Sequence, residues 1–288
     1  MDQGRGSCAA GAPSDERLAR ATRAEIDINY ICPRRCKFCC NSELLKTGAR
    51  MGLPKFMGII DRMPGLSRAD ISGGEPYCEP QLPEMIAYLS GKKVHCDVST
   101  GGTVWRDDVA DAGKRAAKSG LFTLQISIPA LTESVYDSIT ATTGGLPELV
   151  NNAGKFADAF GGGMKASMTI CKENMGEIGL VSELAVRLGI PLFVEPMMLV
   201  GKSAATPLDV RELQLVKFFI MSLRYGGARV HFEFNEAGDS CPVFAKTYGI
   251  PATWGGCAQD GEHAYIDAYG NAAGCTFLKY PNGALSCR

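Results

Sequence analysis

Short apolar runs of strand length alternate with segments whose apolar positions repeat at helical spacing over the first 226 residues. The predicted strands are residues 25–31, 68–72, 93–99, 122–128, 165–171 and 191–197. The predicted helices are residues 82–89, 106–118, 146–160, 174–188 and 208–225. Because strands and helices alternate, this pattern predicts an α/β fold with a mostly parallel sheet and crossover helices.

The pattern changes after Tyr225, where Gly226 and Gly227 end the last predicted helix. The residues that follow are rich in glycine, aromatic residues and cysteine. Among them, the segment AYIDAYGNAAGC, residues 264–275, is typical of a β-hairpin that turns at Tyr-Gly-Asn. We therefore predict three parts. These are a flexible N-terminal tail over residues 1–24, a core over 25–226 and a small C-terminal lobe over 227–288.

Composition and charge exclude several classes of protein. With 288 residues, of which 45% are hydrophobic and 21% charged, the chain can bury a large core and is not intrinsically disordered. Thirty basic residues against 31 acidic ones give a net charge of −1, without the cationic excess that nucleic-acid binding draws on. No apolar run is long enough to cross a bilayer, and the first 24 residues contain no secretory signal. We expect a cytoplasmic protein with neither nucleic-acid nor membrane partners.

Twelve cysteines are too many for a reducing compartment unless most have a chemical role. Four of them crowd into ICPRRCKFCC, residues 31–40, where neighbouring thiols cannot all form separate unstrained disulfides. A metal centre explains this loop better. Zinc is the main alternative, but zinc sites usually combine paired CxxC units or nearby histidines, and none of the three histidines lies near the loop in sequence. Three thiolates on one tight loop suit a [4Fe–4S] cluster that keeps one iron without a protein ligand.

A second motif, GGEP, occupies residues 73–76 directly after a predicted strand. Two glycines let the backbone approach a ligand closely, and Pro76 fixes the exit of the loop. Glu75 offers a carboxylate that could pair with an ammonium group. On its own, the motif is more typical of an ordinary Gly-Pro turn.

Together the two motifs resemble those of radical S-adenosylmethionine (SAM) enzymes. The segment CPRRCKFC matches the CxxxCxxC signature of that family, including an aromatic residue, Phe38, before the third cysteine. GGEP resembles the family element that receives the methionine amino group of SAM. The resemblance implies a partial (β/α)6 TIM-like barrel over residues 25–226, with Cys32, Cys36 and Cys39 as cluster ligands. It also implies that an electron from the cluster cleaves SAM to a 5′-deoxyadenosyl radical, which abstracts hydrogen from an unactivated C–H bond.

Further SAM contacts are expected at the carboxyl ends of the strands, where sites on such barrels gather. Hydroxyl and amide side chains there either bind the ribose or carboxylate of SAM or merely cap helices. Ser127 is the best of them, because QISIPALTESVYD resembles the SIDG strand of peptide-modifying members, although Pro129 and Ala130 replace Asp-Gly. Besides Asn174, the predicted SAM-binding set is Phe38, Gly73, Gly74, Glu75, Pro76, Ser99, Ser127 and Thr169. Arg34 and Arg35 either neutralise an anionic cluster and a substrate carboxylate or only solvate the loop.

The C-terminal lobe carries a third resemblance. Twelve residues separate Cys257 from Gly270, and four separate Gly270 from Cys275. This spacing fits a CX9–15GX4C element and resembles the start of a SPASM or shorter twitch extension. The resemblance implies an auxiliary [4Fe–4S] cluster with Cys241, Cys257, Cys275 and Cys287 as ligands, and structural zinc is the alternative. A full SPASM extension continues with a denser run of cysteines for a second auxiliary cluster. Because this sequence ends at Arg288 without such a run, we expect one auxiliary cluster.

The sequence thus predicts an iron–sulfur oxidoreductase that acts on a ribosomally made peptide by oxidation or cross-linking. Dehydrogenation of a cyclitol or sugar alcohol in natural-product biosynthesis is an alternative, since a core that starts near residue 25 leaves no room for a leader-binding domain. A non-catalytic iron–sulfur scaffold is a third interpretation. We expect a flavodoxin or ferredoxin as electron donor. Glu195, Glu233 and Glu236 are unranked candidates for a general base, and no catalytic residue is assigned.

Overall fold

Six parallel strands form the centre of the computed structural model, which describes residues 14–200, 203–232, 242–248 and 262–276. They are β1 (Arg23–Asn29), β2 (Arg68–Gly73), β3 (His95–Thr100), β4 (Phe122–Ser127), β5 (Met164–Ile170) and β6 (Leu192–Pro196). Each lies within three residues of a predicted strand, and neighbours along the chain pair in parallel. The predicted α/β class with a parallel sheet is therefore confirmed.

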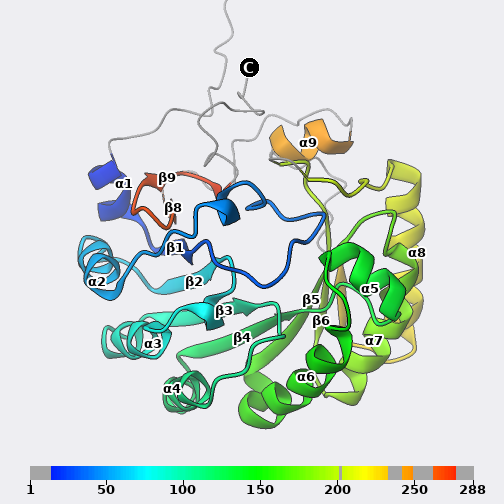
Figure 1. Ribbon diagram of the computed structural model, residues 1–288, viewed down its shortest axis with the longest axis horizontal. Coiled ribbons are helices and arrows are strands. Elements are labelled where there is room, and N and C mark those ends of the chain that lie inside the picture. Colours follow the sequence, from blue (N-terminus) through cyan, green and yellow to red (C-terminus); the bar gives the residue numbers. More distant parts are fainter. Residues whose placement is uncertain (1–13, 201–202, 233–241, 249–261, 277–288) are drawn as a thin grey trace, which may run out of the picture.

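The helices cover one face of this curved sheet (Figure 1). The five predicted helices are present as α3 (Leu82–Gly91), α4 (Asp107–Ala117), α6 (Leu146–Phe160), α7 (Ile178–Arg187) and α8 (Val210–Tyr225). Short 3₁₀ turns are η1 (Leu44–Lys46), η2 (Pro76–Cys78), η3 (Gly161–Gly163) and η4 (Met175–Glu177), the last of which occupies the start of the predicted helix 174–188. No helix that the structure describes has both the length and the apolarity needed to cross a bilayer.

Four further helices were not predicted, and their sequences explain why. They are α1 (Ser14–Arg20), α2 (Leu53–Asp61), α5 (Glu133–Thr140) and α9 (Pro242–Tyr248). Helix α2 contains a proline in its first turn and Gly58 in its interior, both of which weaken a helical signal. Helix α5 is rich in β-branched and hydroxyl residues with low helix propensity. Helix α1 lies within the segment predicted as a tail, and its Leu18 is buried in the core.

The two faces of the sheet differ in polarity. On β4, Phe122, Leu124 and Ile126 are buried against the helices, whereas the alternate residues on the other face are partly exposed. The same alternation recurs along β2 and, apart from the buried Ser167, along β5. Strand register keeps the polar positions in line from strand to strand. The hydrophobic core thus lies under the helices, and the inner face of the partial barrel is polar.

The C-terminal hairpin joins the edge of this sheet at β1. Strand β8 (His263–Ile266) pairs in parallel with β1 and antiparallel with β9 (Ala272–Ala273). Gly270 has φ +90° in the turn, a conformation that glycine adopts without a steric cost. The predicted hairpin is confirmed. At the opposite edge, β7 (Val230–Phe232) pairs with β6 and gives the described sheet the order β7-β6-β5-β4-β3-β2-β1-β8-β9.

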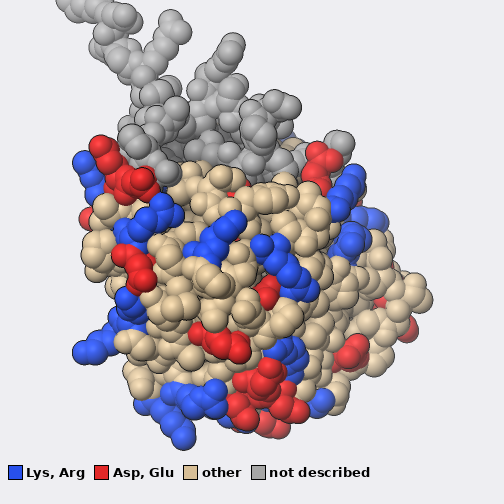
Figure 2. All heavy atoms as spheres, turned by 60° about the vertical axis from the view of Figure 1, so that its left-hand side comes forward, with Lys and Arg blue, Asp and Glu red and all other residues tan. Residues whose placement is uncertain are grey.

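Charged residues are mixed on the face shown in Figure 2, where basic and acidic side chains are interspersed. The described residues also form exposed ion pairs, such as Arg62 with Asp15 at 2.7 Å and Lys92 with Asp61 at 2.6 Å. Exposed pairs of this kind contribute at most about 1 kcal/mol each. The view therefore shows no single-sign patch on this face.

Candidate functional site

The two sequence motifs meet through their backbones. The N–H of Gly74 donates to the carbonyl of Asn29 at 2.8 Å, and the N–H of Glu75 donates to the carbonyl of Ile31 at 2.6 Å. A Cβ at Gly73 or Gly74 would overlap the backbone of Asn29 or Ile31, and Gly73 has φ +124°. The glycines are thus required by the close approach of GGEP to the segment that leads into the cysteine loop. The two predicted motifs form one site.

Two buried asparagines flank the cysteine loop and hold it to GGEP. Asn29 Nδ2 donates to the carbonyl of Glu75 at 3.1 Å, while its Oδ1 accepts the N–H of Ile31 at 2.9 Å. Asn41 Nδ2 donates to the carbonyl of Gly73 at 2.8 Å. Sequence reasoning missed both residues, because an asparagine beside an apolar strand or in a loop carries no motif signal. These bonds fix the spacing between the thiols and the GGEP backbone.

Glu75 is buried, and its carboxylate accepts three hydrogen bonds from this chain. The donors are the N–H of Tyr77 at 3.0 Å, Thr100 Oγ1 at 2.8 Å and the N–H of Gly101 at 2.7 Å. Burial raises the pKa of Glu75 above its usual range, although these three donors act in the opposite direction. The carboxylate therefore ties GGEP to the end of β3. The predicted contact with an ammonium group would have to share oxygens that already serve this purpose.

The cysteine loop is anchored on its other side by α5 and by residues 203–205. The N–H groups of Arg35 and Lys37 donate to the carbonyls of Thr140 and Ile139 at 2.9 and 2.8 Å. The Lys37 carbonyl accepts the N–H of Ala204 at 2.7 Å. Phe38 packs in an apolar cluster with Ile139, Cys171, Met197 and Ala205. This packing orients the aromatic residue of the signature, whose contact with SAM stays a prediction.

Cys32, Cys36 and Cys39 are partly exposed thiols outside any disulfide. Burial raises the pKa of Cys32 to about 11 and raises the pKa values of Cys36 and Cys39 as well. Within the described ranges, no three His, Cys, Asp or Glu side chains are grouped so that they could hold a metal ion. A [4Fe–4S] cluster takes cysteine thiolates as ligands, and three of them leave one iron without a protein partner. The donor set fits a [4Fe–4S] cluster with an open iron.

Hydroxyl side chains line the inner face where the strands end. Ser99 lies opposite Gln125, Ser127 opposite Ser167, and Thr169 opposite Glu195. Among the described residues, none hydrogen-bonds to the hydroxyls of Ser99, Ser127 or Thr169, and all three side chains are partly exposed. They are available to a ligand, and their contact with SAM stays a prediction.

Asn174 makes its side-chain hydrogen bonds within the chain. Its side chain is buried, accepts the N–H of Cys171 at 2.8 Å and donates to the carbonyls of Pro129 and Thr169 at 2.9 and 3.0 Å. All of its amide groups are used within the chain. Of the two roles weighed from the sequence, helix capping is not observed, because the Asn174 side chain makes no capping bond to η4, and its contact with SAM stays a prediction.

The two arginines of the cysteine loop differ. Arg35 is exposed, and its Nη1 donates to the carbonyls of Cys32 at 2.6 Å and Arg34 at 2.8 Å. Arg34 is only 7% exposed. Arg35 thus braces the loop from the solvent side, while Arg34 turns inward.

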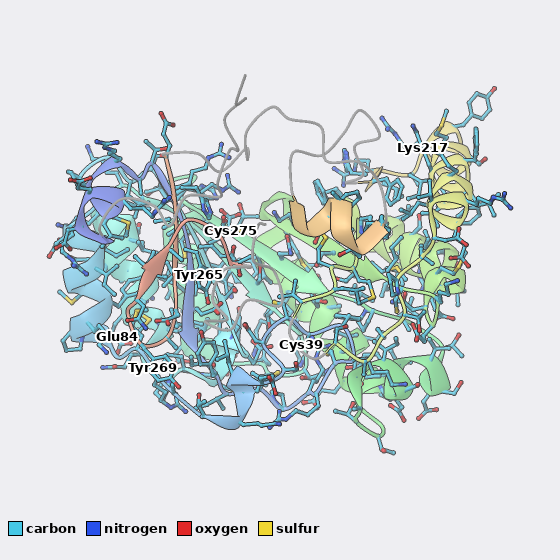
Figure 3. All side chains as sticks on the ribbon, turned by 90° about the horizontal axis from the view of Figure 1, so that it is seen from above. Cys39, Glu84, Lys217, Tyr265, Tyr269 and Cys275 are labelled. Carbon is cyan, nitrogen blue, oxygen red and sulfur yellow. The ribbon has the colours of Figure 1, made fainter. Side chains whose placement is uncertain are left out.

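The hairpin packs beside the cysteine loop. Ala268 shares an apolar cluster with Tyr30 and Leu45, against which Cys32 and Cys39 pack. Figure 3 shows Tyr265 and Cys275 on the hairpin, which lies beside β1. Cys275 follows β9. The other predicted ligands of an auxiliary cluster, Cys241, Cys257 and Cys287, lie outside the described residues, as do Glu233 and Glu236. Glu195 lies on β6.

Comparisons with known proteins agree with this geometry. The model of the Radical SAM superfamily matches residues 26–185. Mycofactocin maturase MftC of Mycobacterium tuberculosis (strain ATCC 25618 / H37Rv) is 27% identical over 168 residues, which cover 58% of this chain and 42% of MftC. PqqA peptide cyclase of Gluconobacter oxydans (strain 621H) is 25% identical over 166 residues, or 57% of this chain and 45% of the cyclase. The chain spans about half the length of these relatives.

A solved structure shows the same fold. The crystal structure of Streptococcus suis SuiB bound to S-adenosylmethionine superposes with a TM-score of 0.73 at 15% sequence identity, covering 91% of this chain and 62% of SuiB. The predicted partial barrel with a C-terminal hairpin is thereby confirmed. Since the family model matches more than half of the residues, and its range includes the cysteine loop and GGEP, this protein belongs to the radical SAM superfamily and is a radical SAM enzyme.

Proposed function

We propose that this protein abstracts hydrogen from a ribosomally made precursor peptide and thereby oxidises or cross-links it. The observation that carries the proposal is the fused framework of the cysteine loop and GGEP, in a chain that is similar to a maturase and to peptide-modifying proteins. MftC is a maturase, the relative from Gluconobacter oxydans is a peptide cyclase, and SuiB has been solved with its precursor peptide SuiA. No feature of the described site favours the cyclitol alternative over this one.

The chain contributes binding and orientation. Cys32, Cys36 and Cys39 would hold a [4Fe–4S] cluster, which would supply the electron for the reductive cleavage of SAM. Asn29 Nδ2 donates to the Glu75 carbonyl at 3.1 Å, and Asn41 Nδ2 donates to the Gly73 carbonyl at 2.8 Å. These bonds hold the GGEP backbone beside the cysteine loop. A ligand placed between the motifs is thus held by atoms whose positions are set before it binds, which lowers the entropic cost of the reactive geometry.

The polar inner face supplies the remaining contacts. Ser99, Ser127 and Thr169 present hydroxyls that can donate to a carboxylate or accept from a ribose hydroxyl. Next to them, Gln125 and Lys165 are paired in register on the same face. Amide and ammonium groups of this kind can hydrogen-bond the carbonyls of a peptide backbone. An extended peptide is therefore a suitable substrate for this surface.

An auxiliary [4Fe–4S] cluster belongs to the same proposal. Cys275, together with Cys241, Cys257 and Cys287, would bind it and let it accept the electron left on the oxidised substrate radical. Two observations support this. Strand β8 pairs with β1, and Ala268 packs in the cluster that contacts Cys32 and Cys39. A flavodoxin or ferredoxin would supply the reducing electron.

The test is anaerobic reconstitution with iron and sulfide, followed by incubation with dithionite, SAM and a candidate precursor peptide. We expect 5′-deoxyadenosine by mass spectrometry and a peptide that has lost hydrogen or gained a ring. Cys36→Ala is the matched negative control, because it removes one cluster ligand. Absence of 5′-deoxyadenosine from fully reconstituted protein would refute the proposal. Turnover of a cyclitol to a ketone, with no change in any peptide, would replace the substrate class.

A further inference from the structure

Arg34 is buried inside the cysteine loop, between two of the three predicted cluster ligands. Its side chain is 7% exposed, whereas the neighbouring Pro33 and Arg35 are exposed. Its Nη1 atom is buried and has no hydrogen-bond partner among the described residues. A buried guanidinium is costly unless a negative charge or an acceptor offsets the loss of water. The position of Arg34 thus points to an anionic group beside it.

Gly101 makes room for the guanidinium. A Cβ at this position would lie 2.6 Å from Cζ of Arg34 and 2.9 Å from its Nε, so any larger residue would displace the side chain. The N–H of Gly101 donates to Glu75 Oε2 at 2.7 Å, and Thr100 Oγ1 donates to the other oxygen at 2.8 Å. Arg34 therefore rests on a loop that Glu75 holds in place. This notch keeps the guanidinium inside the cysteine loop.

The groups that face Arg34 are Cys36, Tyr136 and Glu75. Arginine keeps its proton in proteins, so the buried guanidinium carries a positive charge. The Glu75 carboxylate already accepts three hydrogen bonds. Burial raises the pKa of Tyr136, which keeps its hydroxyl neutral. Besides Glu75, the negative charge that faces Arg34 comes from the cysteine loop, where Cys36 has the largest effect on the guanidinium.

We propose that Arg34, seated against Gly101, supplies a buried positive charge that raises the reduction potential of the cluster bound by Cys32, Cys36 and Cys39. Positive charge and N–H donors near iron–sulfur clusters stabilise the reduced state, which carries one more negative charge. In a site of low dielectric this effect is larger than for an exposed side chain. The inference rests on the proposed function, because it needs the cluster at this loop.

The experiment compares reconstituted wild-type protein with Arg34→Gln, Arg34→Lys and Arg35→Gln in a redox titration followed by electron paramagnetic resonance. Iron and sulfide are counted in each sample first. For Arg34→Gln we expect about a tenfold fall in the ratio of reduced to oxidised cluster at a fixed potential, which is about 59 mV for one electron. Arg34→Lys, which keeps the charge, should stay near the wild type. Arg35→Gln should shift the ratio less, because that side chain is exposed and screened.

An unchanged ratio in Arg34→Gln with full iron content would overturn the inference. Equal shifts in Arg34→Gln and Arg34→Lys would also overturn it, since they would trace the effect to packing rather than to charge. If Arg34→Gln does not retain iron, the same ratio is measured in Gly101→Ala, because its methyl group displaces the guanidinium without removing it. A lowered ratio there supports the inference, and an unchanged one overturns it. Wild-type protein that holds the cluster but forms no 5′-deoxyadenosine would refute the proposed function alone.

Discussion

The hydroxyl of Tyr265 ties the C-terminal hairpin to the buried end of β1, and its removal is the most informative single change. Tyr265 donates to Asp27 Oδ2 at 2.5 Å, and Asp27 is fully buried. The carboxylate also accepts Ser72 Oγ at 3.0 Å and Asn41 Nδ2 at 3.4 Å. Burial, followed by the charge of Asp27, raises the pKa of Tyr265, so its proton stays in place to donate. Tyr265→Phe would remove the shortest of these bonds and leave the ring in place.

The size of the effect follows from the geometry. A hydrogen bond to a charged group contributes about 1.5–3 kcal/mol, and an acceptor left partly unsatisfied in a buried site adds to the loss. The bonds from Ser72 and Asn41 to Asp27 are longer, so they replace little of what is lost. We therefore expect Tyr265→Phe to lower the free energy of unfolding by about 2 kcal/mol. Because Asn41 contacts both Asp27 and the carbonyl of Gly73, part of this loss should reach the motif framework.

Urea denaturation of the metal-free protein, followed by circular dichroism, measures this change. Tyr269→Phe is the matched control: it removes a hydroxyl from the same hairpin, but Tyr269 is 47% exposed. The control should change the free energy of unfolding by less than about 0.5 kcal/mol. Equal values for the two variants would refute the reasoning, because they would show that the bond to Asp27 contributes nothing beyond a solvated hydroxyl.

Three further predictions concern the sheet, the motif framework and the hairpin. Burial, followed by the charge of Asp97, raises the pKa of Asp70 to about 6 in the folded protein. The stability that protonated Asp70 contributes is therefore present below its unfolded pKa and is lost as pH rises toward 6. Asp70→Asn should therefore stabilise the protein at pH 7.5 but not at pH 4, by no more than about 1 kcal/mol because the side chain is 45% exposed. Thermal unfolding at both pH values measures this, and a shift that does not depend on pH would contradict it. Asn41→Leu should lower 5′-deoxyadenosine formation about tenfold or more, because the Gly73 carbonyl loses its donor, while iron content stays near that of the wild type. Cys275→Ala should reduce the iron count from about eight to about four per chain if the hairpin carries an auxiliary cluster. An iron count that Cys275→Ala leaves unchanged would remove that assignment.

The sequence predicts this fold well because strand burial is periodic and local. The six core strands alternate with helices whose apolar positions repeat every three or four residues. Such patterns can be recognised in the sequence without knowing which residues pack against them. Short helices such as α2 and α5 are missed, since their stability comes from packing rather than from propensity. In the site, the motif residues are found because the chemistry demands rare residues at fixed spacing. Asn29 and Asn41 are not found, because their partners are backbone carbonyls that only the fold brings near.

Glu75 shows why recognising a motif is not the same as explaining it. From the sequence, its carboxylate is a candidate partner for an ammonium group. In the structure that carboxylate holds Thr100 and Gly101 in place, and Gly101 in turn provides the notch for Arg34. Glu75 of the GGEP motif thus helps to position the charge of Arg34 in the cysteine loop. It does so through Thr100 and Gly101, which belong to neither motif. The hydrogen bonds of Glu75 and the absence of a side chain at Gly101 therefore help to set the spacing between the motifs. A substitution at Glu75, Thr100 or Gly101 should thus change the surroundings of the cysteine thiols.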